Sequence, residues 1–238
     1  MRLPSWLLLA LPLLAGCPSP YKRVSSSNLE VREMQPTVEA RSDGHLVSFD
    51  VELRRNGYDV VELDAGDALT AKMGGTTLIL TKLDVDESPH YVGQLPVDPS
   101  TDTVLVSLQR RPGRSGAPLS TAKLPAPFEI ASIAPTTVAP DGLVHVQLAG
   151  TPPSKVLVKA TGPCALIDIG DREFDVDAAT HMVTFNAQDL HLSATTACDL
   201  SLAVKAVNHG SLDPAFSGDK AIEPFAAVQV RTASVQVR

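Results

Sequence analysis

The chain has few of the side chains that usually carry catalysis, metal binding or ligand stacking. Among its 238 residues, aromatic side chains make up 4%, Trp6 is the only tryptophan, and cysteine occurs three times. Neither a His-x-x-x-His nor a Cys-x-x-Cys pair occurs, so no zinc-protease helix or zinc ribbon is encoded locally. The six histidines stand singly, at His45, His90, His145, His181, His191 and His209.

Positive charge is also in short supply. The formal net charge is −7 and Lys and Arg form no basic patch, whereas nucleic-acid binding needs clustered cations that displace counterions from phosphates. We therefore expect no nucleic-acid partner. These absences also predict no cofactor and no enzymatic activity, although a triad assembled from distant residues would leave no local pattern.

Long apolar runs are confined to the first residues of the chain. Met1 and Arg2 precede an apolar run from Leu7 to Leu14, and Leu14-Ala15-Gly16-Cys17 follows at its edge. A short positive region, an apolar stretch too short to span a bilayer and small residues before a cleavage point are typical of an export signal. Residues 1–16 are therefore predicted to be a signal peptide.

The four residues ending in Cys17 resemble the lipobox of bacterial lipoproteins. That resemblance implies cleavage after Gly16, diacylation of the Cys17 thiol with palmitate-type chains and N-acylation, which would anchor a soluble domain to a membrane. Pro18 follows without an acidic retention signal, so we expect the outer membrane of the cell envelope. An ordinary secretory signal with an incidental cysteine, or a first helix that stays in the fold, would be the alternatives.

Residues 17–28 are polar and show no periodicity. We interpret them as a lipidated N-terminus and tether with a reach on the order of 20 Å. Removal of the signal peptide also removes Trp6, which leaves a mature chain without tryptophan and with few aromatic side chains for sugar stacking.

From Leu29 onward, short alternating runs separated by turn residues dominate. Val47, Phe49, Val51 and Leu53 alternate with polar residues, and the turn dipeptide Asn56-Gly57 follows, as expected for a half-buried strand and a hairpin. No segment shows a sustained 3.6-residue apolar period, so the fold class is all-β. Further strands are predicted at 76–83, 91–95, 103–108, 143–148, 155–159, 165–169, 182–185, 200–207 and 225–237.

The two halves of the chain look alike. Segments 67–69, 104–108 and 127–128 resemble 164–166, 200–204 and 224–225 at an offset near 97 residues, the size of one immunoglobulin-like sandwich. We therefore predict two tandem Ig-like β-sandwich domains at residues 29–131 and 132–238. One larger sandwich or barrel of about 200 residues is the alternative.

Two cysteines remain once Cys17 is assigned to lipidation. Cys164 and Cys198 lie 34 residues apart in the second half, and export to an oxidising compartment favours a disulfide between them. Such a loop would be stabilised by about 3–4 kcal/mol on the chain-entropy model. The antibody hallmark, a disulfide packed on a buried tryptophan, is missing in both spacing and tryptophan.

Stretches near the C-terminus carry a second resemblance. Residues 198–202, 210–216 and 229–235, with Leu124-Pro125-Ala126-Pro127-Phe128 at the end of the first half, resemble the ends of Ig-like modules in uncharacterised myxobacterial-type lipoproteins. The resemblance implies a fold and an envelope location. It implies no catalytic, cofactor or metal site.

Acidic clusters are the one pattern that could hold a ligand. Ca²⁺ takes six to eight oxygen ligands, and the run Asp171-Arg172-Glu173 followed by Asp175-x-Asp177 also resembles parts of the cadherin calcium motifs, though the spacing differs. Alternating carboxylates on a strand would equally form its solvated face, with Phe174 and Val176 inward. The clusters are Asp168, Asp171, Glu173, Asp175 and Asp177 in the second half, and Asp84, Asp86 and Glu87 in the first.

The expected function is that of a non-catalytic, lipid-anchored cell-envelope protein whose β-sandwich modules contact an envelope protein partner, with edge strands as one route. A calcium-assisted adhesion module is one alternative. An undetected hydrolase is the other, but Gly113-Arg114-Ser115-Gly116 lacks the Gly-x-Ser-x-Gly spacing of a nucleophile elbow.

Overall fold

The computed structural model describes residues 22–86, 88–139, 141–165, 170–191, 197–216 and 224–237. These residues form strands, turns and three short 3₁₀ helices, and none of their helices is long and apolar enough to span a membrane. The prediction of an all-β fold is confirmed. The 3₁₀ helices are η1 (Ser26–Asn28), η2 (Val31–Glu33) and η3 (Ala187–Leu190).

The first sandwich has the strand order of an Ig-like domain. One sheet has the order β2-β3-β8-β7 and the other β10-β9-β5-β6, which correspond to strands A-B-E-D and G-F-C-C′. Their bounds are β2 Gln35–Ser42, β3 Leu46–Arg55, β5 Ala68–Met73, β6 Thr76–Ile79, β7 Thr81–Val85, β8 Ser88–Pro96, β9 Thr103–Gln109 and β10 Ala117–Lys123.

Two further strands extend the A-B-E-D sheet at one end. The turn at Asn56 and Gly57, both in the left-handed region with φ of 53° and 74°, leads from β3 into β4 (Asp59–Glu62). Strand β1 (Arg23–Ser25) then pairs with β4 in parallel. The chain therefore enters the first sandwich beside this turn.

The second sandwich has the same plan. Its sheets are β11-β13-β16, equivalent to A-B-E, and β15-β14-β17-β18, equivalent to C′-C-F-G, with β12 as an A′ strand parallel to β18. The bounds are β11 Phe128–Ala134, β12 Thr137–Val138, β13 Leu143–Gly150, β14 Lys155–Thr161, β15 Arg172–Asp175, β16 Met182–Asn186, β17 Cys198–His209 and β18 Phe225–Val237.

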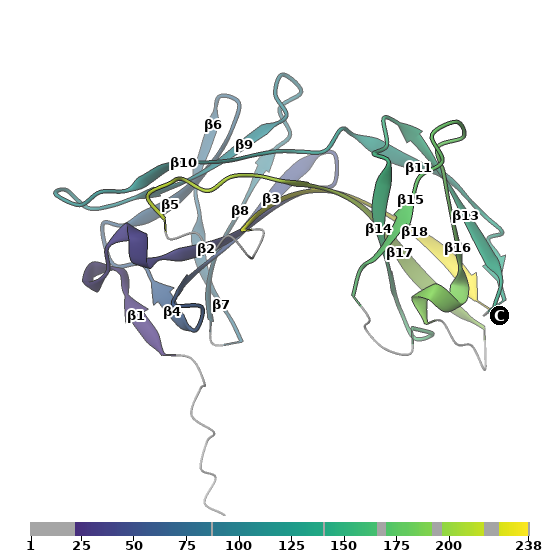
Figure 1. The fold of residues 1–238 in the computed structure, drawn as a ribbon, viewed down its shortest axis with the longest axis horizontal. Helices are drawn as coiled ribbons and strands as arrows, with labels where there is room; N and C mark the ends of the chain where they lie inside the picture. Colours follow the sequence, from purple (N-terminus) through teal and green to yellow (C-terminus); the bar gives the residue numbers. More distant parts are fainter. Residues whose placement is uncertain are drawn as a thin grey trace, which may run out of the picture.

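The F and G strands of the second sandwich extend into the first. The first half of β18 pairs in parallel with β2, from Phe225 opposite Val38 to Gln229 opposite Ser42. The hairpin segment before it bridges to β10, where Ser211 and Thr121 exchange backbone hydrogen bonds. One sheet therefore runs from β3 through β2, β18 and β17 to β14, and Figure 1 shows it bending like an arch between the two sandwiches.

The alternation along β18 shows which side of this sheet is covered. Phe225 and Ala227 lie in the first core, and Val235 and Val237 lie in the second. All four are odd-numbered and therefore point to one face of the strand. Both partner sheets thus pack on one side of the shared sheet, and its other side is left as the inner side of the arch.

The two cores do not follow the predicted boundary between residues 131 and 132. Strand β11 begins at Phe128, which is buried in the second core, so the predicted division falls inside a strand. Phe216, Phe225 and Ala227, which lie in the predicted second domain, pack in the first core. Their apolar side chains close the side of the first sandwich between β2 and β10.

The offset of 97 residues also holds only in part. Val104 and Leu200 both lie in F strands, β9 and β17. Phe128, however, begins an A strand and Phe225 a G strand, and Ala68 begins a C strand whereas Ala165 follows one. The two halves thus share strand order without sharing loop lengths.

The segment expected to be a tether is shorter than residues 17–28. Strand β1 and helix η1 lie against the first sandwich, and Ser26 is fully buried. Hydrogen bonds from Ser25 and Ser27 to the carboxylate of Asp64 lower the pKa of Asp64. These polar contacts explain why a stretch without apolar periodicity is ordered.

Candidate functional site

The inner side of the arch is the candidate functional site, and we refer to it as the inner face. Cross-strand pairing sets its rows: Arg41 lies opposite Val228, Val228 opposite Val207, and Val230 opposite Lys205. Paired residues in adjacent strands point to the same face. The inner face therefore combines residues of both sandwiches on one sheet, and consists of Glu39, Arg41, Asp171, Lys205, Val207, Ala226, Val228 and Val230.

These residues line a hollow of about 170 Å³. Its floor is aliphatic, and Val228 and Val230 on it are each only 6% exposed. A cavity of about 150 Å³ is large enough to hold a benzene molecule. The hollow thus has the size and polarity for one apolar side chain.

A second hollow of about 400 Å³ adjoins the first, on the same face of the sheet, over β2, β3 and β8. Glu39 and Arg41 line both hollows, so they stand at the border between them. Its remaining lining residues are Ser48, Phe49, Asp50, Val92, Gly93 and Gln94.

Glu39 and Arg41 differ from the neighbouring charged groups in having no partner. Both side chains are exposed, and within the described ranges no ion pair or hydrogen bond holds either of them. Lys205 and Asp171, by contrast, pair at 2.8 Å between Nζ and Oδ1 at the far wall of the first hollow. The inner face therefore offers one unpaired carboxylate and one unpaired guanidinium beside an apolar floor.

Charged side chains further along β3 satisfy one another. His90 Nδ1 lies 2.7 Å from Asp50 Oδ1, and Ser88 donates a hydrogen bond to Glu52 at 2.7 Å. Burial raises the pKa of Glu52, but hydrogen bonds from Arg54 and Ser88 outweigh it, so the net pKa is lowered. This part of the sheet carries fixed charges that are already compensated.

The free edge of β7 is less suited to accept a partner strand. Lys82 forms an ion pair with Glu62, and Asp84 lies 3.4 Å from Arg23. Charged side chains of this kind protect sheet edges from pairing. Ile79, Leu83 and Val85 are exposed on β6 and β7, and apolar exposure of this kind would favour a partner. No described contact shows such pairing, so pairing at this edge stays a prediction.

The acidic turn of the second sandwich is spread over separate contacts. Glu173 pairs with Lys155 at 2.5 Å, and Asp177 accepts hydrogen bonds from the backbone of Ala179 and Thr180, which lower the pKa of Asp177. Phe174 packs toward the core and Val176 is buried, as expected for a solvated strand face. Asp175 is exposed, and Asp168 lies outside the described residues, as do Glu87 and Cys17.

No metal centre is assembled in the part of the chain that the structure describes, where no three His, Cys, Asp or Glu side chains gather to hold an ion. Asp84 contacts Arg23 and Lys82, and Asp86 lies in the turn after β7. His45 precedes β3 and is exposed, and His145 lies within β13 with Nδ1 3.0 Å from Thr184. Nothing described favours the calcium alternative.

Ser115 lies exposed in the turn between β9 and β10. No hydrogen bond joins it to a histidine or carboxylate among the described side chains. The hydrolase alternative therefore gains no support from this position.

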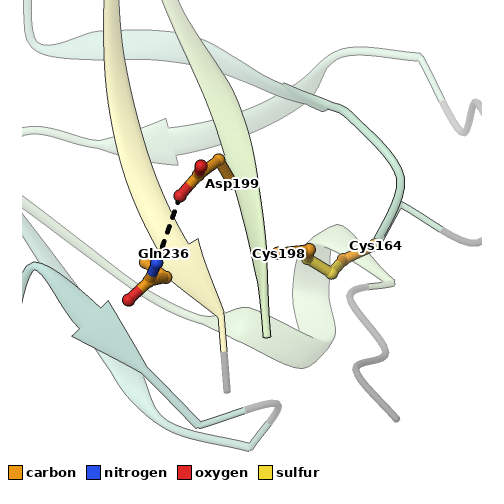
Figure 2. The surroundings of a disulfide bond; sticks show 4 residues. All are labelled: Cys164, Cys198, Asp199 and Gln236. Atoms are coloured by element: carbon orange, nitrogen blue, oxygen red, sulfur yellow. Dashed lines mark hydrogen bonds between the residues drawn. A yellow bond between two sulfur atoms is a disulfide. The ribbon is translucent and has the colours of Figure 1, made fainter. Parts of the chain in front are cut away.

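The disulfide expected in the second half is present. Cys164 and Cys198 are joined, with their Cα atoms 6.2 Å apart. Figure 2 shows the bond linking the first residue of β17 to the loop that follows β14, beside the hydrogen bond from Gln236 to Asp199. The bond thus ties the F strand to the C–C′ loop, whereas antibody domains join the B and F strands.

Comparisons with known proteins supply no family. No protein-family model and no curated protein matches the chain. A structure of the mouse coronavirus receptor-binding domain complexed with its murine receptor aligns at 7% identity over 87% of this chain and 99% of that chain, with a TM-score of 0.22.

Two structures of the titin I-band region I67–I69, one an E-to-A variant, align at 10% identity over 87% of this chain, with TM-scores of 0.25. This chain covers 63% and 64% of those two chains. TM-scores this low do not establish a shared fold, so the Ig-like architecture is assigned from the strand order described above.

Proposed function

We propose that this chain is a lipid-anchored protein of the bacterial cell envelope, held through Cys17 at the outer membrane, and that its Ig-like sandwiches bind an envelope protein partner. The inner face is the binding surface. The partner presents an extended segment that places one apolar side chain in the first hollow.

The observation that carries the proposal is the pair of uncompensated charges on β2. Glu39 and Arg41 stand without ion-pair partners between two hollows, although almost every other charged side chain near them is paired. An apolar pocket with polar groups at its rim is the usual anatomy of a protein interface. A basic residue opposite Glu39 and an acidic residue opposite Arg41 would complete this one.

The experiment places a photoreactive amino acid at Gln94, an exposed residue that lines the second hollow, in cells that express the full chain, so that Glu39 and Arg41 both stay in place. We expect crosslinking to one envelope protein, and we expect Glu39→Lys to abolish it because the new charge repels the basic group of the partner. Both positions are exposed, so the fold tolerates these changes.

Two controls make the result specific. A photoreactive residue at Leu119, which is 63% exposed on β10 of the opposite sheet, should not crosslink to that protein. Glu30→Lys, which reverses an exposed charge away from the inner face, should leave the Gln94 crosslink intact. Equal crosslinking from Leu119, or a crosslink that survives Glu39→Lys, would show that the inner face is not the binding surface.

A further inference from the structure

We infer that the turn between β3 and β4 is a second membrane contact, in which Tyr58 inserts into the interfacial region of the bilayer. This inference rests on the proposed anchor at Cys17. It concerns a different surface from the inner face, and its ligand is a phospholipid bilayer.

Only a short length of chain separates the proposed anchor from the fold. Lys22 O accepts a hydrogen bond from Val60 N at 3.0 Å, so the chain is fixed to the start of β4 at Lys22. Lys22 comes only five residues after Cys17, and five residues of chain span at most about 18 Å. This end of the first sandwich therefore stays close to the lipid surface.

Tyr58 lies at the same end of the first sandwich as Lys22. Strands β1 and β4 run parallel, with Arg23 opposite Val60, so the start of β1 and the start of β4 lie at the same end of the sandwich. Tyr58 precedes β4 in the same turn. Its side chain is 76% exposed, the largest exposed fraction of any large apolar or aromatic side chain in the described ranges.

The turn holds Tyr58 in place before any contact forms. Tyr58 N donates a hydrogen bond to Arg55 O at 3.2 Å, and Gly57 N donates to Gln35 Oε1 at 2.7 Å. No hydrogen bond or ring contact to another described residue occupies the phenol ring itself. A rigid backbone with a free aromatic side chain loses little conformational entropy on binding.

The side chains at this end have the chemistry that suits a membrane–water boundary. Tyrosine has an apolar ring and a polar hydroxyl, and such amphipathic rings are enriched at the membrane–water boundary. Lys22, whose carbonyl accepts the hydrogen bond from Val60, is exposed and has no ion pair among the described residues, so its ammonium can meet phosphate groups. Because the anchor makes the contact intramolecular, its effective concentration is high and a weak interaction suffices.

The experiment uses the absence of tryptophan from the mature chain. Tyr58→Trp creates a single fluorophore at the turn, and Leu119→Trp creates one on β10 as the matched control with similar exposure. Each lipidated variant is reconstituted into vesicles of phosphatidylethanolamine and phosphatidylglycerol with brominated acyl chains. Vesicle flotation reports the anchor, and tryptophan emission reports the contact.

We expect both variants to float and only Trp at position 58 to show emission at shorter wavelength and quenching by bromine. Flotation with no shift at position 58, or equal quenching at both positions, would overturn the inference and leave the anchor standing. Failure of both variants to float would overturn the anchor, and the inference with it.

Discussion

Asp67 and Arg110 form an ion pair inside the first sandwich. Asp67 Oδ2 lies 2.7 Å from Arg110 Nε, and both side chains are 1% exposed. Asp67 also accepts a hydrogen bond from Ser26 Oγ at 2.7 Å, and Arg110 donates to Ser26 O at 2.8 Å. This pair therefore fixes the N-terminal segment that the anchor would pull on.

Replacement of one partner should destabilise the fold strongly. In Asp67→Asn, Arg110 keeps a buried charge without a counter-charge, which costs about 3–5 kcal/mol. The measurement is urea unfolding of the mature chain. The double variant Asp67→Leu with Arg110→Met removes both charges and should lose less than Asp67→Asn alone, and a loss under about 1 kcal/mol for Asp67→Asn would contradict a buried pair.

Strand β18 is the element that decides how the two sandwiches are joined. Phe225 is fully buried in the first core, and Val38 N donates to Pro224 O at 2.7 Å at the point where β18 meets β2. Leu119 N donates to Asp213 Oδ2 at 2.8 Å on the β10 side. The hairpin of the second sandwich is thus part of the first.

Phe225→Ala should therefore weaken the first sandwich although the residue lies near the C-terminus. Loss of a buried Phe side chain costs about 3–5 kcal/mol through lost burial and a cavity. Hydrogen exchange should become faster in β2, β3 and β10. Leu202→Ala, in the second core on β17, is the matched control and should accelerate exchange in β13 and β16 instead; faster exchange confined to the second sandwich in both variants would contradict the shared core.

At the scale of the whole molecule, buried side chains fill the junction between the sandwiches on the side of the shared sheet opposite the inner face. Arg231 is almost fully buried, with Nε 3.0 Å from Glu129 Oε1 and its guanidinium 5.6 Å from the centre of the Phe128 ring. Gly44 has φ of +99°, and a Cβ there would lie 2.6 Å from Arg231 Nη2. The turn after β2, the strand β18 and the strand β11 meet at this arginine, which supports the bend of the shared sheet.

The location of the molecule should depend on one cysteine. Cys17→Ser removes the proposed acceptor of the acyl chains, and without their burial the protein should move from the membrane fraction to the soluble fraction of the envelope. Cell fractionation measures this. Cys198→Ser, which removes a cysteine outside the lipobox, should stay with membranes, and membrane retention of Cys17→Ser would show that the anchor lies elsewhere.

The sequence alone determined the elements whose alternation is strong. The run from Val47 to Leu53 became β3, the Asn56-Gly57 turn closed beside it, and the long run at 225–237 became β18. Alternation and turn residues are local properties, so they can be recognised without knowing the partners of a strand. The disulfide was predicted on a different ground, because only Cys164 and Cys198 remain once Cys17 is assigned to lipidation.

Only the tertiary structure decided which strands pair and which charges stay unpaired. Strand β2, with Glu39 and Arg41, shows the same alternation of buried and exposed residues, but the pattern was weak in the sequence because three of its buried positions are Pro36, Ala40 and Ser42, which are poor strand formers or not apolar. The extension of β18 into the first sandwich, the burial of Ser26 and the inner face all depend on contacts between residues far apart in the chain. Such contacts leave no local pattern, because their free energy comes from pairing and burial that exist only once the sheet has formed.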